Sequence, residues 1–147
     1  MTNEMRVDGA CYCGKVTIDG RVSADKVMAC HCTDCQKFSG APFRAVAVMS
    51  ADNVTIAGPV QEYLKVADSG NERVQGFCGN CGSQIFAADP QKTLFMVRTG
   101  CLSQHDQLVP AKHIFGKSAA AWLGSIDHQQ WVTDGPASAE MEPPTQK

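Results

Sequence analysis

The chain has 147 residues, of which 44% are hydrophobic and 19% charged, and its formal net charge is −2. This length is typical of one domain with a buried core, and the slightly negative charge gives no attraction to phosphate backbones or anionic membranes. No stretch approaches the roughly 20 apolar residues of a membrane span, and residues 1–9 contain no apolar signal segment. We therefore expect a soluble, cytoplasmic protein with no nucleic-acid or membrane partner.

Short strands separated by turns are predicted along most of the chain. The Asp19-Gly20 pair suits a tight type I′ turn, so a β-hairpin is expected within residues 15–22. Residues 33–39 are too polar for a strand and predict one helical turn that ends at Gly40. Further strands are expected at 27–32, 42–49, 54–56, 61–66, 72–77, 84–87, 93–98 and 112–115. The fold class is therefore predicted to be mainly β.

A single domain is predicted for residues 9–133, preceded by an N-terminal tail at 1–8. Residues 134–147 are rich in Pro, Glu, Ser and Thr and show no apolar periodicity. Such a composition does not bury enough apolar surface to fold, so we predict a disordered C-terminal tail.

Eight cysteines are the main chemical feature of the sequence, and seven of them occur in closely spaced groups. Cysteines two or three residues apart seldom bridge one another without strain, but they converge easily on one metal ion. Thiolate sulfur is also the ligand that zinc prefers in proteins. The groups are therefore interpreted as zinc ligands rather than as a disulfide framework.

Three of these thiols fall within six residues, at Cys30, Cys32 and Cys35. Zinc takes four ligands, and catalytic zinc sites usually keep three protein ligands and leave the fourth position open. If no other residue supplies a fourth ligand, this group is able to bind and activate a small molecule.

The other four grouped thiols suit a closed, structural site. Cys78 and Cys81 lie on a predicted tight turn followed by Gly82, and Cys11 and Cys13 are likewise followed by a glycine. Together they would form a four-cysteine site that contributes to folding and not to catalysis. An alternative partition joins Cys32 and Cys35 to Cys78 and Cys81 as a zinc ribbon, although the separation exceeds the usual spacing of such sites.

Three segments of the sequence resemble the glutathione-dependent formaldehyde-activating family, which also includes centromere protein V. They are GACYCG at 9–14, CHCTDCQKFSG at 30–40 and GFCGNCG at 76–82, and KHIF at 112–115 and Trp122 are similar to the C-terminal part of the family pattern. The resemblance implies a β-tent fold, made of two small antiparallel sheets, with two zinc ions per chain. It implies a structural site at Cys11, Cys13, Cys78 and Cys81 and a catalytic site at Cys30, Cys32 and Cys35.

The same resemblance implies a carbon–sulfur lyase that binds a small thiol such as glutathione and acts on its aldehyde adduct, S-hydroxymethylglutathione. A non-catalytic, zinc-stabilised protein-interaction module is the alternative, because proteins with the same fold often have different functions. Thiol redox chemistry at the cysteines is a third interpretation.

Several other residues have both a functional and a structural interpretation. Cys101 departs from the family pattern and is either a buried, idle thiol, a fourth ligand of the second site or a redox group. His31 and Asp34 are interpreted as structural rather than as proton donors. Lys37 and Arg44 would be able to meet a glutathione carboxylate, but single surface cations are common.

Overall fold

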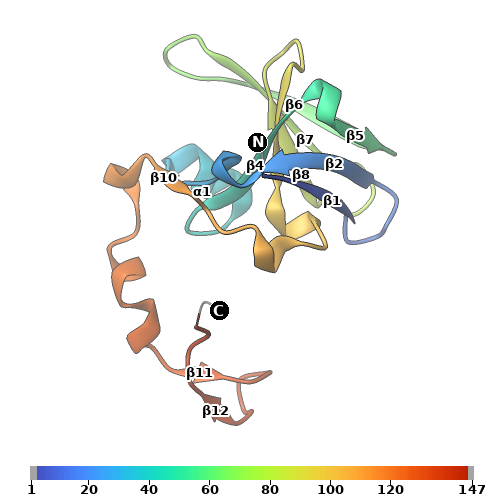
Figure 1. The fold of residues 1–147 in the computed structure, drawn as a ribbon. Helices are drawn as coiled ribbons and strands as arrows, with labels where there is room; N and C mark the ends of the chain where they lie inside the picture. Colours follow the sequence, from blue (N-terminus) through green and yellow to red (C-terminus); the bar gives the residue numbers. More distant parts are fainter. Residues whose placement is uncertain (1–2, 146–147) are drawn as a thin grey trace.

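The computed structural model describes residues 3–145, and it contains two principal β-sheets (Figure 1). The smaller sheet has the order β1-β2-β5, with β1 at Glu4–Ala10, β2 at Thr17–Ser23 and β5 at Val54–Ala57. The larger sheet has the order β10-β3-β4-β9-β8-β7-β6. Its strands are β3 (Val27–Cys30), β4 (Arg44–Ser50), β6 (Val60–Val66), β7 (Glu72–Cys78), β8 (Gln84–Ala88), β9 (Leu94–Arg98) and β10 (Lys112–Ile114). The predicted mainly β fold is confirmed.

All neighbouring strands of the two sheets pair antiparallel except β10 and β3, which are parallel. Helix α1 (Thr33–Ser39) follows β3 directly and occupies the predicted helical turn. In the described part of the chain, short 3₁₀ segments connect the strands: η1 (Ala24–Lys26), η2 (Ala51–Asn53), η3 (Thr99–Cys101), η4 (His105–Gln107), η5 (Gly116–Ser118) and η6 (Ala121–His128). Among residues 3–145, no helix is both long and apolar enough to cross a membrane.

The larger sheet separates two environments because side chains alternate between its faces. On β4, Ala47 and Met49 point into the main hydrophobic core, which is shared with Val7 and Ile18 of the smaller sheet. Residues Arg44 and Val46 of the same strand line a cleft on the opposite face. One face of the sheet therefore builds the core, and the other builds the floor of a cavity.

The predicted hairpin at Asp19-Gly20 is wrong. Both residues lie inside the single strand β2, which pairs with β1 from Glu4↔Ser23 to Ala10↔Thr17. Gly20 is needed for close packing and not for a turn. A Cβ atom added there would lie 2.8 Å from both the Asn53 carbonyl oxygen and Met49 Sδ.

We expect Gly20→Ala to lower the free energy of unfolding by about 1–3 kcal/mol, the usual penalty for overpacking a filled core. Gly124→Ala is the matched control, since no atom lies within 4 Å of the added Cβ. Urea denaturation followed by circular dichroism measures both variants. Equal stability of the two would contradict the packing explanation.

The segment after η5 extends away from the body of the molecule as an arm, shown orange to red in Figure 1. It contains η6 and a small hairpin of β11 (Trp131–Val132) and β12 (Glu140–Met141). Strand β12 lies within residues 134–147, where the sequence predicts disorder, and β1 begins within the predicted tail 1–8. Residues 1–2 and 146–147 lie outside the described range. Parts of both predicted tails, 1–8 and 134–147, therefore have regular structure. The domain bounds of 9–133 stay a prediction.

Candidate functional site

The structure brings seven of the eight cysteines into two groups, and all eight are free thiols. Within each group, the sulfur atoms lie within 4.8 Å of one another. The first group contains Cys11, Cys13, Cys78 and Cys81, and the second contains Cys30, Cys32 and Cys35. Cys32 and Cys35 are thus grouped apart from Cys78 and Cys81, which is not the arrangement of a zinc ribbon.

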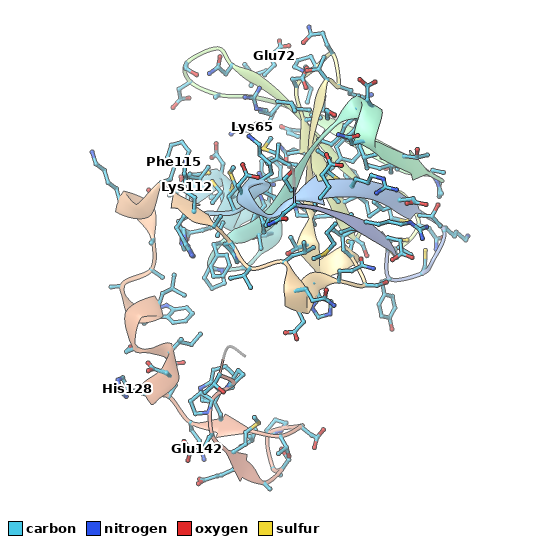
Figure 2. All side chains as sticks on the ribbon, in the orientation of Figure 1. Lys65, Glu72, Lys112, Phe115, His128 and Glu142 are labelled. Carbon is cyan, nitrogen blue, oxygen red and sulfur yellow. The ribbon has the colours of Figure 1, made fainter. Side chains whose placement is uncertain are left out.

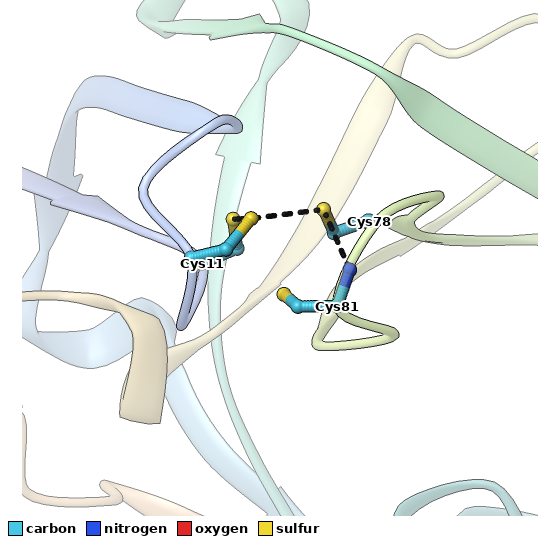
Figure 3. A group of neighbouring side chains, drawn as sticks. Cys11, Cys78 and Cys81 are labelled. Carbon is cyan, nitrogen blue, oxygen red and sulfur yellow. Dashed lines mark hydrogen bonds between the residues drawn. The ribbon is translucent and has the colours of Figure 1, made fainter.

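The first group forms where the turn after β1 meets the turn between β7 and β8. Figure 3 shows Cys11 facing Cys78 and Cys81 across this junction. The sulfur of Cys13 lies 3.5 Å from that of Cys11 and 3.8 Å from that of Cys78. A tetrahedral zinc ion with Zn–S bonds of about 2.3 Å separates its sulfur ligands by about 3.8 Å. These four thiols therefore fit a closed, four-sulfur metal site.

Backbone amides support the negative charge of this first group. The Val16 N–H donates to Cys11 Sγ over 3.2 Å, and the Asn80 and Cys81 N–H groups donate to Cys78 Sγ over 3.4 and 3.5 Å. The turn that aims these amides requires a left-handed residue after Cys81, and Gly82 supplies it with φ of 78°. Hydrogen bonds from Ser83 lower the pKa of Cys81 to about 5.

The second group forms at the end of β3 and the beginning of α1. Cys30 is the last residue of β3, Cys32 caps the helix and Cys35 lies in its first turn. The Cys35 N–H donates to Cys32 Sγ over 3.3 Å, so one sulfur is both a potential ligand and the helix cap. Burial, together with the neighbouring Cys30 and Cys32 thiols, raises the pKa of Cys35 to about 12. A metal ion that binds this group must displace that proton.

A cleft of about 470 Å³ opens beside the second group and is lined by all three of its cysteines. This volume is in the range of small-molecule sites in proteins. Residues from all seven strands of the larger sheet line it, because alternate positions on neighbouring strands share one face. Lys65 and Phe115 also line the cleft and lie on the same side of the molecule in Figure 2.

The fourth position of the second group is filled neither by His31 nor by Cys101. The buried His31 Nε2 lies 2.8 Å from Nδ1 of His113, and the ring is near Phe43. Burial lowers the pKa of His31, and nearby His113 lowers it further. Cys101 Sγ donates to the Gln84 carbonyl oxygen over 3.3 Å and is absent from both cysteine groups.

Arg44 is not the single surface cation that the sequence led us to expect, and Arg98, which the sequence analysis did not single out, lies in the same environment. Arg44 and Arg98 are each only 8% exposed, and both line the cleft. Lys65, by contrast, forms an ion pair with Asp34 and lowers the pKa of that carboxyl group. The sequence signal for the two arginines was weak: each stands at one end of an otherwise apolar strand.

Comparison with known proteins supports the fold and identifies the family. The profile of the family described as "Glutathione-dependent formaldehyde-activating enzyme" matches residues 6–118. A crystal structure of a protein from Rhodobacter sphaeroides is similar at a TM-score of 0.56 and 16% sequence identity. The match covers 72% of this chain and 98% of that one, and at this identity it supports the fold alone. The family profile spans well over half of the chain and all seven grouped cysteines, so the chain belongs to the glutathione-dependent formaldehyde-activating enzyme family.

Proposed function

We propose that this protein is a zinc-dependent carbon–sulfur lyase that binds a glutathione-type thiol and forms or cleaves its aldehyde adduct, S-hydroxymethylglutathione. The observation that carries the proposal is the contrast between the two cysteine groups. The first group brings together four sulfurs from two distant turns, whereas the second group has three sulfurs and lines a cleft. Three ligands and an accessible fourth position are the arrangement of catalytic zinc sites.

Zinc bound by Cys30, Cys32 and Cys35 would supply a soft acceptor for sulfur, and coordination favours the ionised form of a thiol. The residues of the cleft hold the thiol and aldehyde close together, which replaces a bimolecular encounter by a local one. The thiolate sulfur then adds to the aldehyde carbon, and the resulting alkoxide takes up a proton. In the reverse direction the carbon–sulfur bond breaks and the aldehyde leaves.

Water is the proton source that fits this cleft best. The ion pair with Lys65 favours the ionised form of the Asp34 carboxyl group, so this carboxylate has no proton to donate at neutral pH. The Nε2 atom of His31 is engaged by His113, and the ring is buried. The cleft itself is open to solvent at Lys65 and Phe115, whose side chains are partly exposed.

The test is to replace zinc by cobalt and to titrate the protein with glutathione. We expect a sulfur-to-cobalt charge-transfer band that increases with bound thiol, and NMR should show S-hydroxymethylglutathione forming faster than in the uncatalysed reaction. An unchanged spectrum at saturating glutathione would contradict the proposal.

A non-catalytic interaction module is the second candidate, and the arm after η5 is the observation that favours it. The arm lies beyond the family match and exposes Trp122, Ile126 and Met141 at 40–46% of their surface. Normal folding and metal content without any thiol binding would favour this candidate.

We expect two zinc ions per chain after purification without chelator, measured by elemental analysis. A chelator should remove the ion of the second group first, because that group has three thiols and borders the cleft. Circular dichroism should show the folded protein retained at this stage. Loss of both ions in one step, together with unfolding, would be inconsistent with two separate sites.

A further inference from the structure

Arg44 and Arg98 form a pair of buried guanidinium groups beside the second cysteine group. Arg44 lies directly opposite Cys30 in the β3–β4 ladder, and Arg98 lies opposite Val46, two residues further along β4. All four residues line the cleft, so the two guanidinium groups and Cys30 arise from the same face of the sheet.

Each arginine is held in place, but part of each guanidinium group has no partner. Arg44 Nη1 donates to Gln75 Oε1 over 2.8 Å, and Arg98 Nη2 donates to Gln84 Oε1 over 3.0 Å. Arg44 also stacks on Phe38, with 5.6 Å from Cζ to the ring centroid. Within the described structure, the buried Arg44 Nε and the buried Nε and Nη1 of Arg98 have no hydrogen-bond acceptor.

A carboxylate does not neutralise this pair. Asp34 is the only acidic side chain among the described residues that line the cleft, and Lys65 already pairs with it. Burial and the proximity of Arg44 lower the pKa of Arg98 to about 9, while Cys35, Cys101 and Cys30 act in the opposite direction. Apart from Asp34, the cleft residues that would carry negative charge beside the two guanidinium groups are the cysteines, once a metal ion has bound them.

The charges around the second cysteine group indicate which kind of ligand suits its open fourth position. Three thiolates and one divalent ion carry one net negative charge, whereas the two guanidinium groups carry two positive charges. A thiolate as fourth ligand raises the negative charge to two and balances the pair, whereas a neutral ligand leaves one buried cation uncompensated. Buried charges without compensation are costly, so this difference favours an anionic ligand.

The first cysteine group supports this interpretation by contrast. Its four sulfurs receive three backbone N–H groups. The second group receives one backbone N–H group, at Cys32, and has the two arginines beside it. Beside the second group, positive side chains thus supply the compensation for negative charge that backbone amides supply in the first group.

We infer that Arg44 and Arg98 are specificity-determining residues that select a thiolate, rather than water or another neutral ligand, for the open position beside Cys30, Cys32 and Cys35. This inference rests on the proposed function. A metal ion held by the three cysteines would supply an acceptor for the sulfur of a thiol that has lost its proton to solvent, and the two guanidinium charges would stabilise that thiolate. Neither arginine takes part in bond formation.

The experiment compares two ligands of the cobalt-loaded protein by absorbance titration: 2-mercaptoethanol, which binds as an anion, and imidazole, which binds neutral. Arg98→Gln and Arg44→Gln should each weaken the binding of 2-mercaptoethanol about tenfold or more and change that of imidazole less than about twofold, because one charge interaction is removed. Arg98→Lys, which keeps the charge, should recover most of the thiol affinity. Arg21→Gln, which removes an exposed charge from β2 in the other sheet, is the control and should change neither.

Thermal denaturation of every variant identifies loss of folding, and Arg44→Gln provides a second test if Arg98→Gln is unstable. Equal weakening of both ligands would show a general packing effect and overturn the inference, as would unchanged thiol affinity in both variants. Binding of imidazole but of no thiol to the unaltered protein would instead overturn the proposed function and the inference with it.

Discussion

Cys81→Ser should unfold or aggregate the protein and remove one metal ion. The thiol belongs to the group that joins the turn after β1 to the turn between β7 and β8. A structural zinc site contributes on the order of 10 kcal/mol to folding, which is comparable to the whole stability of a typical domain. We expect the melting temperature to fall by more than about 10 °C, measured by circular dichroism alongside elemental analysis.

Cys101→Ser is the matched control for this variant. Cys101 is also partly buried, but it belongs to neither group and makes one hydrogen bond, to the Gln84 carbonyl oxygen, that a hydroxyl group is able to replace. Its metal content should be unchanged and its stability altered by less than about 1 kcal/mol. If Cys81→Ser melted at the same temperature as this control and kept both ions, the first group would not be a structural site.

Cys32→Ser should also remove one metal ion, but unlike Cys81→Ser it should leave the protein folded. The binding of thiol should be lost. Serine keeps the helix cap at α1, because its hydroxyl oxygen accepts the Cys35 N–H as the sulfur does. We therefore expect a change in unfolding free energy of less than about 1 kcal/mol. Glutathione should then produce no charge-transfer band in the cobalt-substituted protein.

The comparison between Cys32→Ser and Cys81→Ser tests the division between the two groups directly. Both substitutions remove a single sulfur from a cluster of cysteines. Equal losses of thermal stability would show that the groups share one structural role, and the lyase proposal would lose its main support.

The close spacing of the cysteines could be interpreted from the sequence because local rules govern it, whereas the partition of the seven thiols into two groups was implied by the family resemblance. The Cys78-x-x-Cys81-Gly82 turn and the cap at Cys32 depend on residues only a few positions apart. Cys11 and Cys13 converge because they lie in a turn closed by the Gly14 N–H donating to the Cys11 carbonyl oxygen. Short-range spacing thus indicated which cysteines lie close together, although it did not predict the backbone that brings them together.

Long-range pairing explains what the sequence did not predict. Strand β9 pairs with β4 although four strands, β5 to β8, lie between them in the sequence, and this pairing places Arg98 near Arg44. No local pattern encodes that neighbour. Asp19-Gly20 shows the converse: a strong local turn signal yields to β2, which pairs with strands on both sides.

The alternation of side chains on β3 and β4 restricts how this site is able to change during evolution. Deleting one residue from either strand would turn Cys30 or Arg44 from the cleft toward the core, because a shift of one position exchanges the two faces. Homologues are thus expected to vary the floor of the cleft by substitution, at constant strand length. We expect insertions instead in the loop between β6 and β7, where Ser69 and Asn71 border the cleft. Changes of loop length there would reshape the entrance of the cleft while the cysteines and the arginines keep their positions.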